Sequence, residues 1–95
     1  MRLSKEKINF LKTEILSIKP DADVFLFGSR SDNNKRGGDI DILIITSNPL
    51  TVREKSNLLI NFWKKFGEQR VDLVCFTPES SAPFKQLALQ SAIKL

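Results

Sequence analysis

Residues 39–46, with the sequence DIDILIIT, constrain the fold of this chain more than any other segment. The run is rich in β-branched residues and nearly continuously apolar after its second aspartate, which is typical of a strand buried on both faces. Such a strand needs a covering layer on each side, so it predicts a central position in a sheet that helices flank. Asp39 and Asp41 stand out at its head, because like charges beside a buried strand are costly.

The rest of the chain supplies the neighbours that this strand needs. Apolar residues recur at helical spacing in two long segments, which are stopped by Pro20 and near Gly67, and two further short apolar runs predict strands. The expected elements are helices over 5–19, about 51–66 and 82–95, and strands over 24–27, 39–46 and 70–76. This order predicts an α/β (α+β) domain with a small mixed sheet of about three to four strands.

Two of the predicted helices have assignable apolar faces. In the middle helix the face comprises Leu58, Leu59, Phe62, Trp63 and Phe66. In the last helix we expect Phe84, Leu87 and Ile93 to point inward. Exposed positions on either helix are candidates for a partner surface, although core filling is the favoured role of Trp63 and its neighbours.

Composition limits the classes of protein to which the chain can belong. With 95 residues, 41% hydrophobic and 27% charged, it is expected to form a single globular domain over residues 1–95. Cys75 is the only cysteine, so no internal disulfide can form and a cytoplasmic location is expected. No segment has the length or the apolar core of a membrane span or a signal peptide. Histidine is absent, so it can serve neither as a metal ligand nor as a general base.

Asp39 and Asp41 predict a cation site. Strand side chains alternate between faces, so both carboxylates point the same way, roughly 7 Å apart along the strand. A cation that neutralises them would remove the repulsion, and oxygen ligands without sulfur or imidazole suit Mg²⁺ or Mn²⁺ rather than zinc. The alternative is that Asp39 is a loop or cap residue and Asp41 a solvated edge charge, and the pair alone does not decide between these.

Asp72 adds a third carboxylate near the start of the strand over 70–76. If this strand neighbours the one over 39–46, all three carboxylates converge at one end of the sheet. Three such groups can hold two divalent cations and accept a proton from an attacking hydroxyl. The alternative is a surface charge that pairs with Arg70.

Gly28 and Ser29 directly follow a predicted strand and could form the complementary phosphate site. Glycine lets a phosphate approach the backbone, and the amides that follow point at an anion. Arg30, Lys35 and Arg36 lie in the same loop. An ordinary turn with a serine cap is the alternative, and for Lys35 and Arg36 a solvated loop position is favoured. The formal net charge of +4 permits an anionic ligand, but a solvated surface explains it equally well.

The combination FGSRSDNNKRGGDIDILI with the later RVDLV resembles the nucleotidyltransferase superfamily that includes DNA polymerase beta. In particular it looks like the minimal nucleotidyltransferases (MNT domains) of prokaryotic HEPN–MNT pairs, over nearly the whole chain. Nine residues separate Ser29 from Asp39, about one fewer than the commonest spacing in the family, which indicates a trimmed loop.

The resemblance implies a polymerase-beta-like fold and a Mg²⁺-dependent transfer of a nucleotidyl group, AMP from ATP or another nucleoside triphosphate. Asp39, Asp41 and Asp72 would be the catalytic residues and would bind two Mg²⁺ ions, with Mn²⁺ as a substitute. Asp72 would also help to activate the acceptor hydroxyl. Gly28 and Ser29 would hold the β- and γ-phosphates, with Arg30 beside them.

The resemblance also implies a partner, a HEPN protein that can be an RNase toxin and that the MNT protein modifies on a tyrosine as antitoxin. The chain contains no tyrosine, so any transfer to tyrosine must occur in trans. The alternative is a non-catalytic antitoxin that neutralises its partner by forming a complex. Direct nucleic-acid binding is not favoured, because the basic residues form no stripe interleaved with aromatics.

Overall fold

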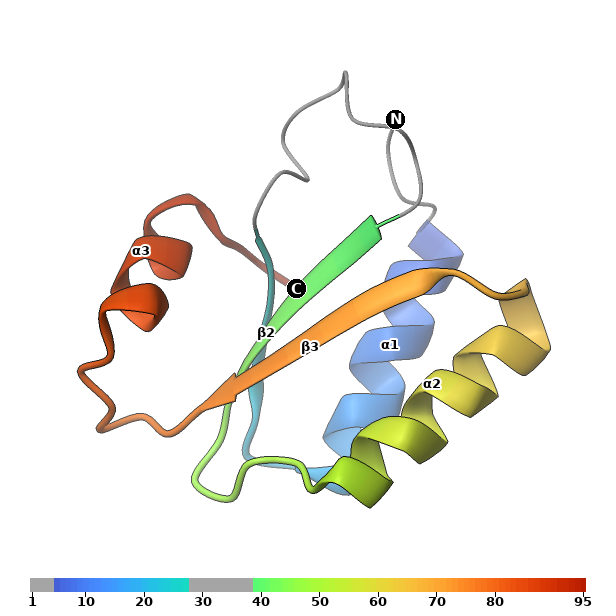
Figure 1. The fold of residues 1–95 in the computed structure, drawn as a ribbon, viewed down its shortest axis with the longest axis horizontal. Helices are drawn as coiled ribbons and strands as arrows, with labels where there is room; N and C mark the ends of the chain where they lie inside the picture. Colours follow the sequence, from blue (N-terminus) through green and yellow to red (C-terminus); the bar gives the residue numbers. More distant parts are fainter. Residues whose placement is uncertain (1–4, 28–38) are drawn as a thin grey trace.

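The chain folds into three helices and four strands within the residues described by the computed structural model, which are 5–27 and 39–95, without the side chain of Asp39. The elements are α1 (Lys5–Ile18), β1 (Asp23–Leu26), β2 (Asp39–Ile45), α2 (Val52–Phe66), β3 (Arg70–Phe76), α3 (Pro83–Ser91) and β4 (Ile93–Lys94). Figure 1 shows the strands crossing the middle of the molecule, with α1 and α2 on one side and α3 on the other. Within the described ranges, no helix has the length and apolarity needed to cross a membrane.

The four strands form one mixed sheet in the order β3-β2-β1-β4. β1 runs antiparallel to β2 and to β4, whereas β2 and β3 are parallel. The predicted central position of residues 39–46 and the predicted mixed sheet are therefore confirmed. The parallel pairing matters most for function, because it places the starts of β2 and β3 at the same end of the sheet.

The main core lies between the sheet and the pair α1 and α2. Ile40, Ile42 and Ile44 of β2 are fully buried and face this layer, which follows from the alternation of side chains along a strand. The helices contribute buried Leu11, Ile15, Leu58 and Phe62, with Leu59, Trp63 and Phe66 packed at the margin. The predicted apolar face of the middle helix is therefore confirmed as core, including the position of Trp63.

α2 begins and ends where the sequence predicts. The Thr51 hydroxyl accepts the Glu54 N–H at 3.1 Å, and the Glu54 carboxylate accepts the Thr51 N–H at 2.9 Å, which is a complete capping box. At the other end Gly67 adopts a φ of 91°, a backbone conformation that favours glycine, and donates its N–H to the Trp63 carbonyl. These caps set the orientation of the chain as it enters β3.

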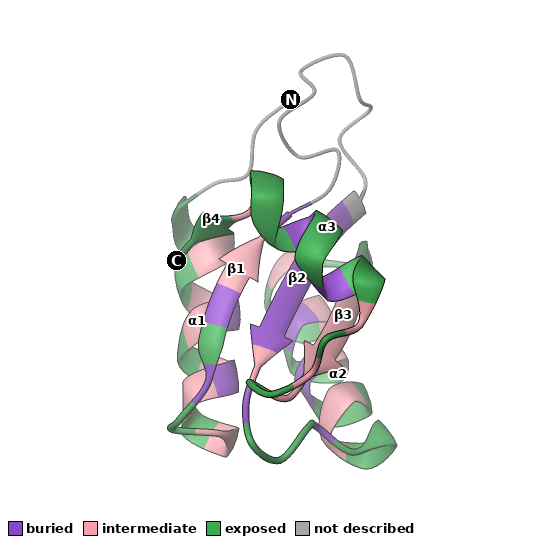
Figure 2. Ribbon diagram, turned by 90° about the vertical axis from the view of Figure 1, so that its left-hand side faces the viewer, coloured by how far each residue is buried: buried purple, intermediate pink, exposed green. Residues whose placement is uncertain are grey.

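The second face of the sheet is only partly covered. Leu43 of β2 is fully buried there against Phe27 and Ala88, and the Phe84 ring contacts Phe27 and Phe76 at centroid distances of 5.8 and 6.2 Å. α3 lies beside the carboxyl end of β3, away from the first residues of that strand (Figure 1). Figure 2 shows the purple, buried middle of β2 between its neighbouring strands.

The prediction of one helix from 82 to 95 is wrong at its end, because α3 stops at Ser91 and β4 follows. β4 pairs with β1, with Phe25 opposite Lys94 and Leu26 opposite Ile93, and Lys94 forms a 3.3 Å ion pair with Asp23. Pairing satisfies backbone groups along the outer edge of β1, which a continued helix would leave open.

The inward residues of α3 also differ from the prediction. Phe84, Leu87 and Ile93 are 49%, 63% and 58% exposed, whereas Lys85 and Ala88 are buried. The Lys85 ammonium donates to the carbonyls of Thr77, Pro78 and Ser80 at 3.1, 2.9 and 2.9 Å. Three hydrogen bonds compensate the burial of the charge and fasten the turn after β3 to α3.

Asp21 links the turn before β1 to the end of β2. Its carboxylate accepts the Ser47 N–H at 3.0 Å, the Thr46 hydroxyl at 2.8 Å and the Ser47 hydroxyl at 2.9 Å. These hydrogen bonds favour the charged form and lower the pKa of Asp21 from 3.8 to about 2.

The lowered pKa of Asp21 predicts a pH-dependent contribution to stability. A carboxyl whose pKa is lower in the folded state stabilises the fold above its unfolded pKa, near 3.8, and loses that contribution as the pH falls toward about 2. We therefore expect the stability difference between the wild type and Asp21→Asn, measured by urea unfolding, to shrink from pH 5 to pH 2. A difference that stays constant over this range would contradict the assignment.

Candidate active site

The pairing of β2 with β3 brings two of the predicted carboxylates together. Asp41 lies directly opposite Asp72 in the parallel register, with strands that are about 4.8 Å apart. Asp72 alternates with Val74 and Phe76 on the α3 side of the sheet, and Asp41 shares that side with Leu43. The expectation that the strands over 39–46 and 70–76 are neighbours is confirmed.

Asp39 begins β2 and lies opposite Arg70 in the register. Its backbone is thus two residues along the strand from the Asp41–Asp72 pair. Its side chain lies outside the described residues. Among the described side chains, no group of three histidine, cysteine or acidic residues could hold a metal ion. The convergence of all three carboxylates therefore stays a prediction.

The predicted phosphate-binding residues Gly28, Ser29 and Arg30 lie outside the described residues, as do Lys35 and Arg36. The residue that precedes them is informative. Phe27 donates its backbone N–H to the Asp41 carbonyl at 3.1 Å, so the chain reaches Gly28 directly from a position beside Asp41. The roles of Gly28, Ser29 and Arg30 remain predictions.

Asp72 has a basic neighbour on its own strand. Arg70 Nε lies 3.7 Å from Asp72 Oδ2, and the two side chains are 72% and 48% exposed. This is the ion pair that the alternative interpretation of Asp72 predicts. An ion pair this exposed contributes about 0–1 kcal/mol, so it leaves the carboxylate available to a stronger ligand.

The residue before β3 is held from two sides. The Trp63 indole N–H donates to the Gln69 carbonyl at 2.8 Å, and the Lys7 ammonium donates to the Gln69 side-chain oxygen at 3.0 Å. These bonds connect α2 and α1 to the start of β3 and fix the backbone that carries Arg70 and Asp72. These bonds are not readable from the sequence, because a contact such as Lys7 to Gln69 spans 62 positions and leaves no local pattern.

Comparison with known proteins identifies the family. A family model described as "Nucleotidyltransferase domain" matches residues 8–95, which is most of the chain. The chain belongs to the nucleotidyltransferase domain family. A comparison of this nucleotidyltransferase domain with curated proteins gives no match.

Solved structures with the same fold are antitoxins bound to toxins. A tri-AMPylated HEPN toxin from Shewanella oneidensis in complex with its MNT antitoxin matches with a TM-score of 0.67 and 20% identity, over 97% of this chain and 71% of that one. A toxin–antitoxin structure with AMP-PNP matches with a TM-score of 0.68 and 25% identity, over 97% and 72%. A mutant MntA–HpeT toxin–antitoxin pair matches with a TM-score of 0.64 and 25% identity, over 98% and 71%. The predicted fold is confirmed.

The oxygen donors of the Asp41–Asp72 pair suit a hard divalent cation. Asp41 and Asp72 offer carboxylate oxygens from one face, whereas Cys75 packs against the core on the other face. Oxygen donors without sulfur suit Mg²⁺. The described residues enclose no pocket at this position.

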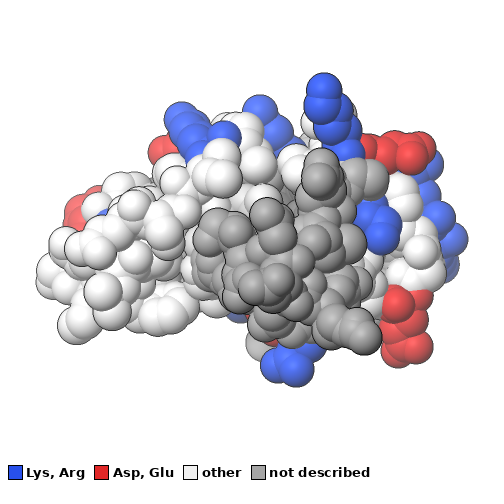
Figure 3. Space-filling view, turned by 90° about the horizontal axis from the view of Figure 1, so that it is seen from above, with Lys and Arg blue, Asp and Glu red and all other residues white. Residues whose placement is uncertain are grey.

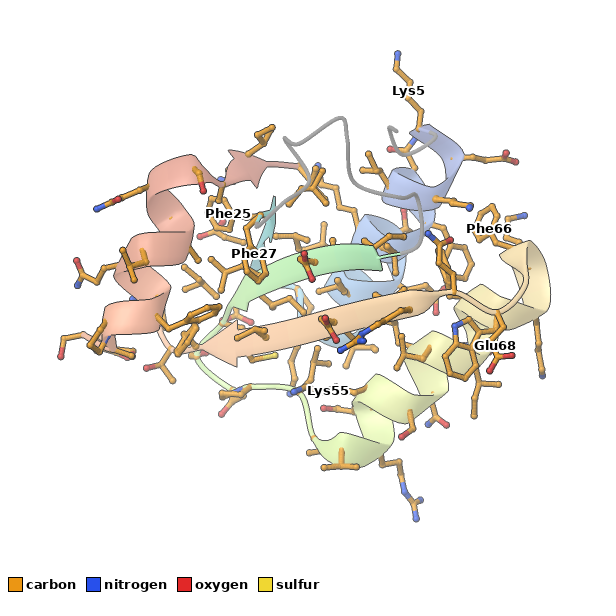
Figure 4. The ribbon with its side chains drawn as sticks, turned by 45° about the horizontal axis from the view of Figure 1, so that its top comes forward. Lys5, Phe25, Phe27, Lys55, Phe66 and Glu68 are labelled. Carbon is orange, nitrogen blue, oxygen red and sulfur yellow. The ribbon has the colours of Figure 1, made fainter. Side chains whose placement is uncertain are left out.

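Charged side chains of both signs are visible on the molecular surface from above (Figure 3). Figure 3, which views the molecule from above, shows Lys and Arg side chains in several directions and Asp and Glu side chains among them. In Figure 4, Lys5 extends from the start of α1, while Phe25 and Phe27 lie toward α3.

Proposed function

We propose that this nucleotidyltransferase domain transfers AMP from ATP to a hydroxyl of a HEPN-class partner protein and thereby acts as an antitoxin. The observation that carries the proposal is the position of Asp41 opposite Asp72 on adjacent parallel strands. The family match supports a transferase, and the related toxin–antitoxin structure with AMP-PNP supports an adenine nucleotide as substrate.

The residues of the chain have distinct roles in this proposal. Asp39, Asp41 and Asp72 would hold Mg²⁺, which when bound supplies positive charge to the phosphates. The acceptor oxygen attacks the α-phosphorus, the bond from that phosphorus to the β-phosphate oxygen breaks, and pyrophosphate leaves. The Asp72 carboxylate takes the proton of the acceptor hydroxyl. Gly28 and Ser29, with Arg30, bind the β- and γ-phosphates.

The acceptor must lie on another molecule if it is a tyrosine, because this chain contains none. The HEPN toxin in the Shewanella oneidensis complex is tri-AMPylated, which shows that a partner of an MNT protein can carry AMP. We therefore propose a tyrosine of the HEPN partner as the acceptor.

Transfer of label tests this function. The chain and a HEPN partner from the same genome are incubated with ATP labelled at the α-phosphate, with and without Mg²⁺. We expect label on the partner only, and only with Mg²⁺. Label on this chain, or no label on the partner with Mg²⁺ present, would contradict the proposal.

Neutralisation by complex formation alone is a second candidate function, and an apolar surface favours it. Phe84, Leu87, Leu89 and Ile93 of α3 and β4 are exposed, and we call these four residues the α3 surface. The only charged residue of α3 is Lys85, which is buried, and the α3 side of the molecule is mostly white in Figure 3. Phe84 also contacts Phe27, whose backbone is bonded to Asp41. A HEPN partner on this surface would lie on the α3 side of the sheet, the face that Asp41 and Asp72 also share.

An acidic residue at Leu87 is expected to weaken the complex. Leu87 is 63% exposed, so Leu87→Asp leaves the core intact but places a charge in an apolar contact, and we expect the Kd for the partner to rise at least about tenfold. Thr13→Asp adds the same charge at an exposed position of α1, outside both helices that could form the partner surface, and serves as the control. Equal Kd values for the two variants, measured by calorimetry, would exclude the α3 surface as the interface.

A further inference from the structure

Arg70 is a basic residue that lies next to the Asp41–Asp72 pair. It starts β3 opposite Asp39 and alternates onto the same face as Asp72, with its Nε 3.7 Å from Asp72 Oδ2. A guanidinium carries only donors and stays charged at any accessible pH, so it cannot become a metal ligand. Arg70 and a divalent cation are therefore both attracted to the Asp72 carboxylate, and a cation bound there repels the guanidinium.

The backbone next to Arg70 is held in place, whereas the Arg70 side chain is exposed. The neighbouring Gln69 is held by the Trp63 indole and the Lys7 ammonium, which fixes the start of β3. The Arg70 side chain is 72% exposed, and its contact with Asp72 is longer than a hydrogen bond. The guanidinium can therefore leave Asp72 without any movement of the strand.

We propose that Arg70 is a positioning residue that holds the Asp72 carboxylate until a divalent cation displaces it. The inference rests on the proposed function in one respect, because it takes Asp72 as a ligand of the cation. Arg70 neutralises part of the repulsion between Asp72 and Asp41 in the free protein. Because the cation breaks the Arg70–Asp72 ion pair when it binds, the net affinity of the site for the cation is lower than it would be without Arg70. Arg70 thereby sets the cation concentration at which the site fills.

The affinity for Mn²⁺ alone tests the proposal without any catalytic turnover. The full chain is titrated calorimetrically with Mn²⁺ at constant ionic strength, as wild type, Arg70→Gln, Arg53→Gln and Asp72→Asn. Loss of a competing exposed ion pair is expected to tighten Mn²⁺ binding about two- to fivefold in Arg70→Gln. Arg53 is an exposed residue in the first turn of α2, so Arg53→Gln removes the same charge elsewhere and should match the wild type. Asp72→Asn should bind more weakly.

The possible results separate the two claims. If the wild type binds no Mn²⁺, the proposed function itself is contradicted. If the wild type binds Mn²⁺ but Arg70→Gln binds it no more tightly than Arg53→Gln does, only the role of Arg70 is overturned. Thermal unfolding of each variant checks that the change in affinity does not reflect loss of folded protein.

A spectroscopic measurement observes the displacement directly. The side-chain Nε–H signals of Arg70 and Arg53 are followed in nitrogen-15 NMR spectra while diamagnetic Mg²⁺ is added. We expect the Arg70 signal to shift in the wild type and to stay in place in Asp72→Asn, with the Arg53 signal constant in both. An Arg70 signal that does not respond to saturating Mg²⁺ in the wild type would overturn the proposal.

Discussion

Replacing Asp41 by asparagine is expected to lower the rate of AMP transfer to the partner by about 10³-fold. Asp41 lies opposite Asp72 at the head of β2, so it is half of the described carboxylate pair. An amide is a neutral and weaker ligand than a carboxylate, and the charge stabilisation that a bound cation supplies is worth several kcal/mol in the transition state. About 4 kcal/mol corresponds to the expected loss in rate.

The same substitution should leave the fold nearly unchanged. The hydrogen bond that Asp41 provides to Phe27 comes from its backbone carbonyl, which asparagine retains. Asparagine also keeps the shape of aspartate and a side-chain oxygen that accepts hydrogen bonds, and it removes a charge beside Asp72, so we expect the free energy of unfolding to change by less than about 1 kcal/mol. A large loss of activity with a small change in stability is the pattern of a catalytic group rather than a structural one.

Asp23→Asn provides the matched control for Asp41→Asn. Asp23 is an exposed aspartate at the start of β1, and its partner is Lys94 of β4. Loss of this exposed ion pair should cost about 0–1 kcal/mol and leave transfer unaffected. Transfer by Asp41→Asn at more than a tenth of the wild-type rate would contradict the catalytic assignment. Toxin neutralisation that persists in Asp41→Asn would instead favour complex formation as the antitoxic activity.

Replacing Phe62 by alanine is expected to destabilise the protein by about 3–5 kcal/mol, the range found for large aromatic residues in cores. Phe62 is fully buried between the sheet and α1, with ring centroids 6.0 Å from Phe10 and 4.9 Å from Phe66. Alanine would leave a cavity that rigid neighbours on three elements cannot fill. Domains of this size have a total stability of about 5–15 kcal/mol, so much of the margin would be lost.

Ile60→Ala on the same helix separates the cavity effect from helix propensity. Ile60 is 46% exposed, so its truncation removes little buried surface and should change the free energy of unfolding by less than about 0.5 kcal/mol. Urea unfolding followed by circular dichroism measures both variants. A loss below about 1 kcal/mol for Phe62→Ala would mean that the core between α1, α2 and the sheet is not packed as described.

The sequence by itself determined those helices and strands in which apolar residues recur at a regular spacing. The isoleucines of residues 39–45 predict a central strand, and those at positions 40, 42 and 44 are fully buried in β2. The helix expected over about 51–66, with a stop near Gly67, matches α2, whose caps are Thr51 and Gly67. These features are readable because burial on a helix or strand repeats every few residues and because caps act within one turn.

The candidate site was predictable in its residue types but not in its geometry. The aspartates at the heads of two apolar strands indicated a shared carboxylate site, conditional on the strands being neighbours. Only the tertiary structure decided that Asp41 and Asp72 lie at the same register, because the whole of α2 separates them along the chain. The Arg70–Asp72 pair was readable from sequence only as an alternative to a functional role.

The C-terminal region shows most clearly what only the tertiary structure decided. Residues 82–95 have a helical pattern, yet the last residues form β4 because the edge of β1 offers backbone partners. Lys85 is buried because three carbonyls of the turn after β3 converge on its ammonium. Both outcomes depend on hydrogen-bonding groups that other elements bring near, and such groups leave no trace in the local pattern of apolar and polar residues.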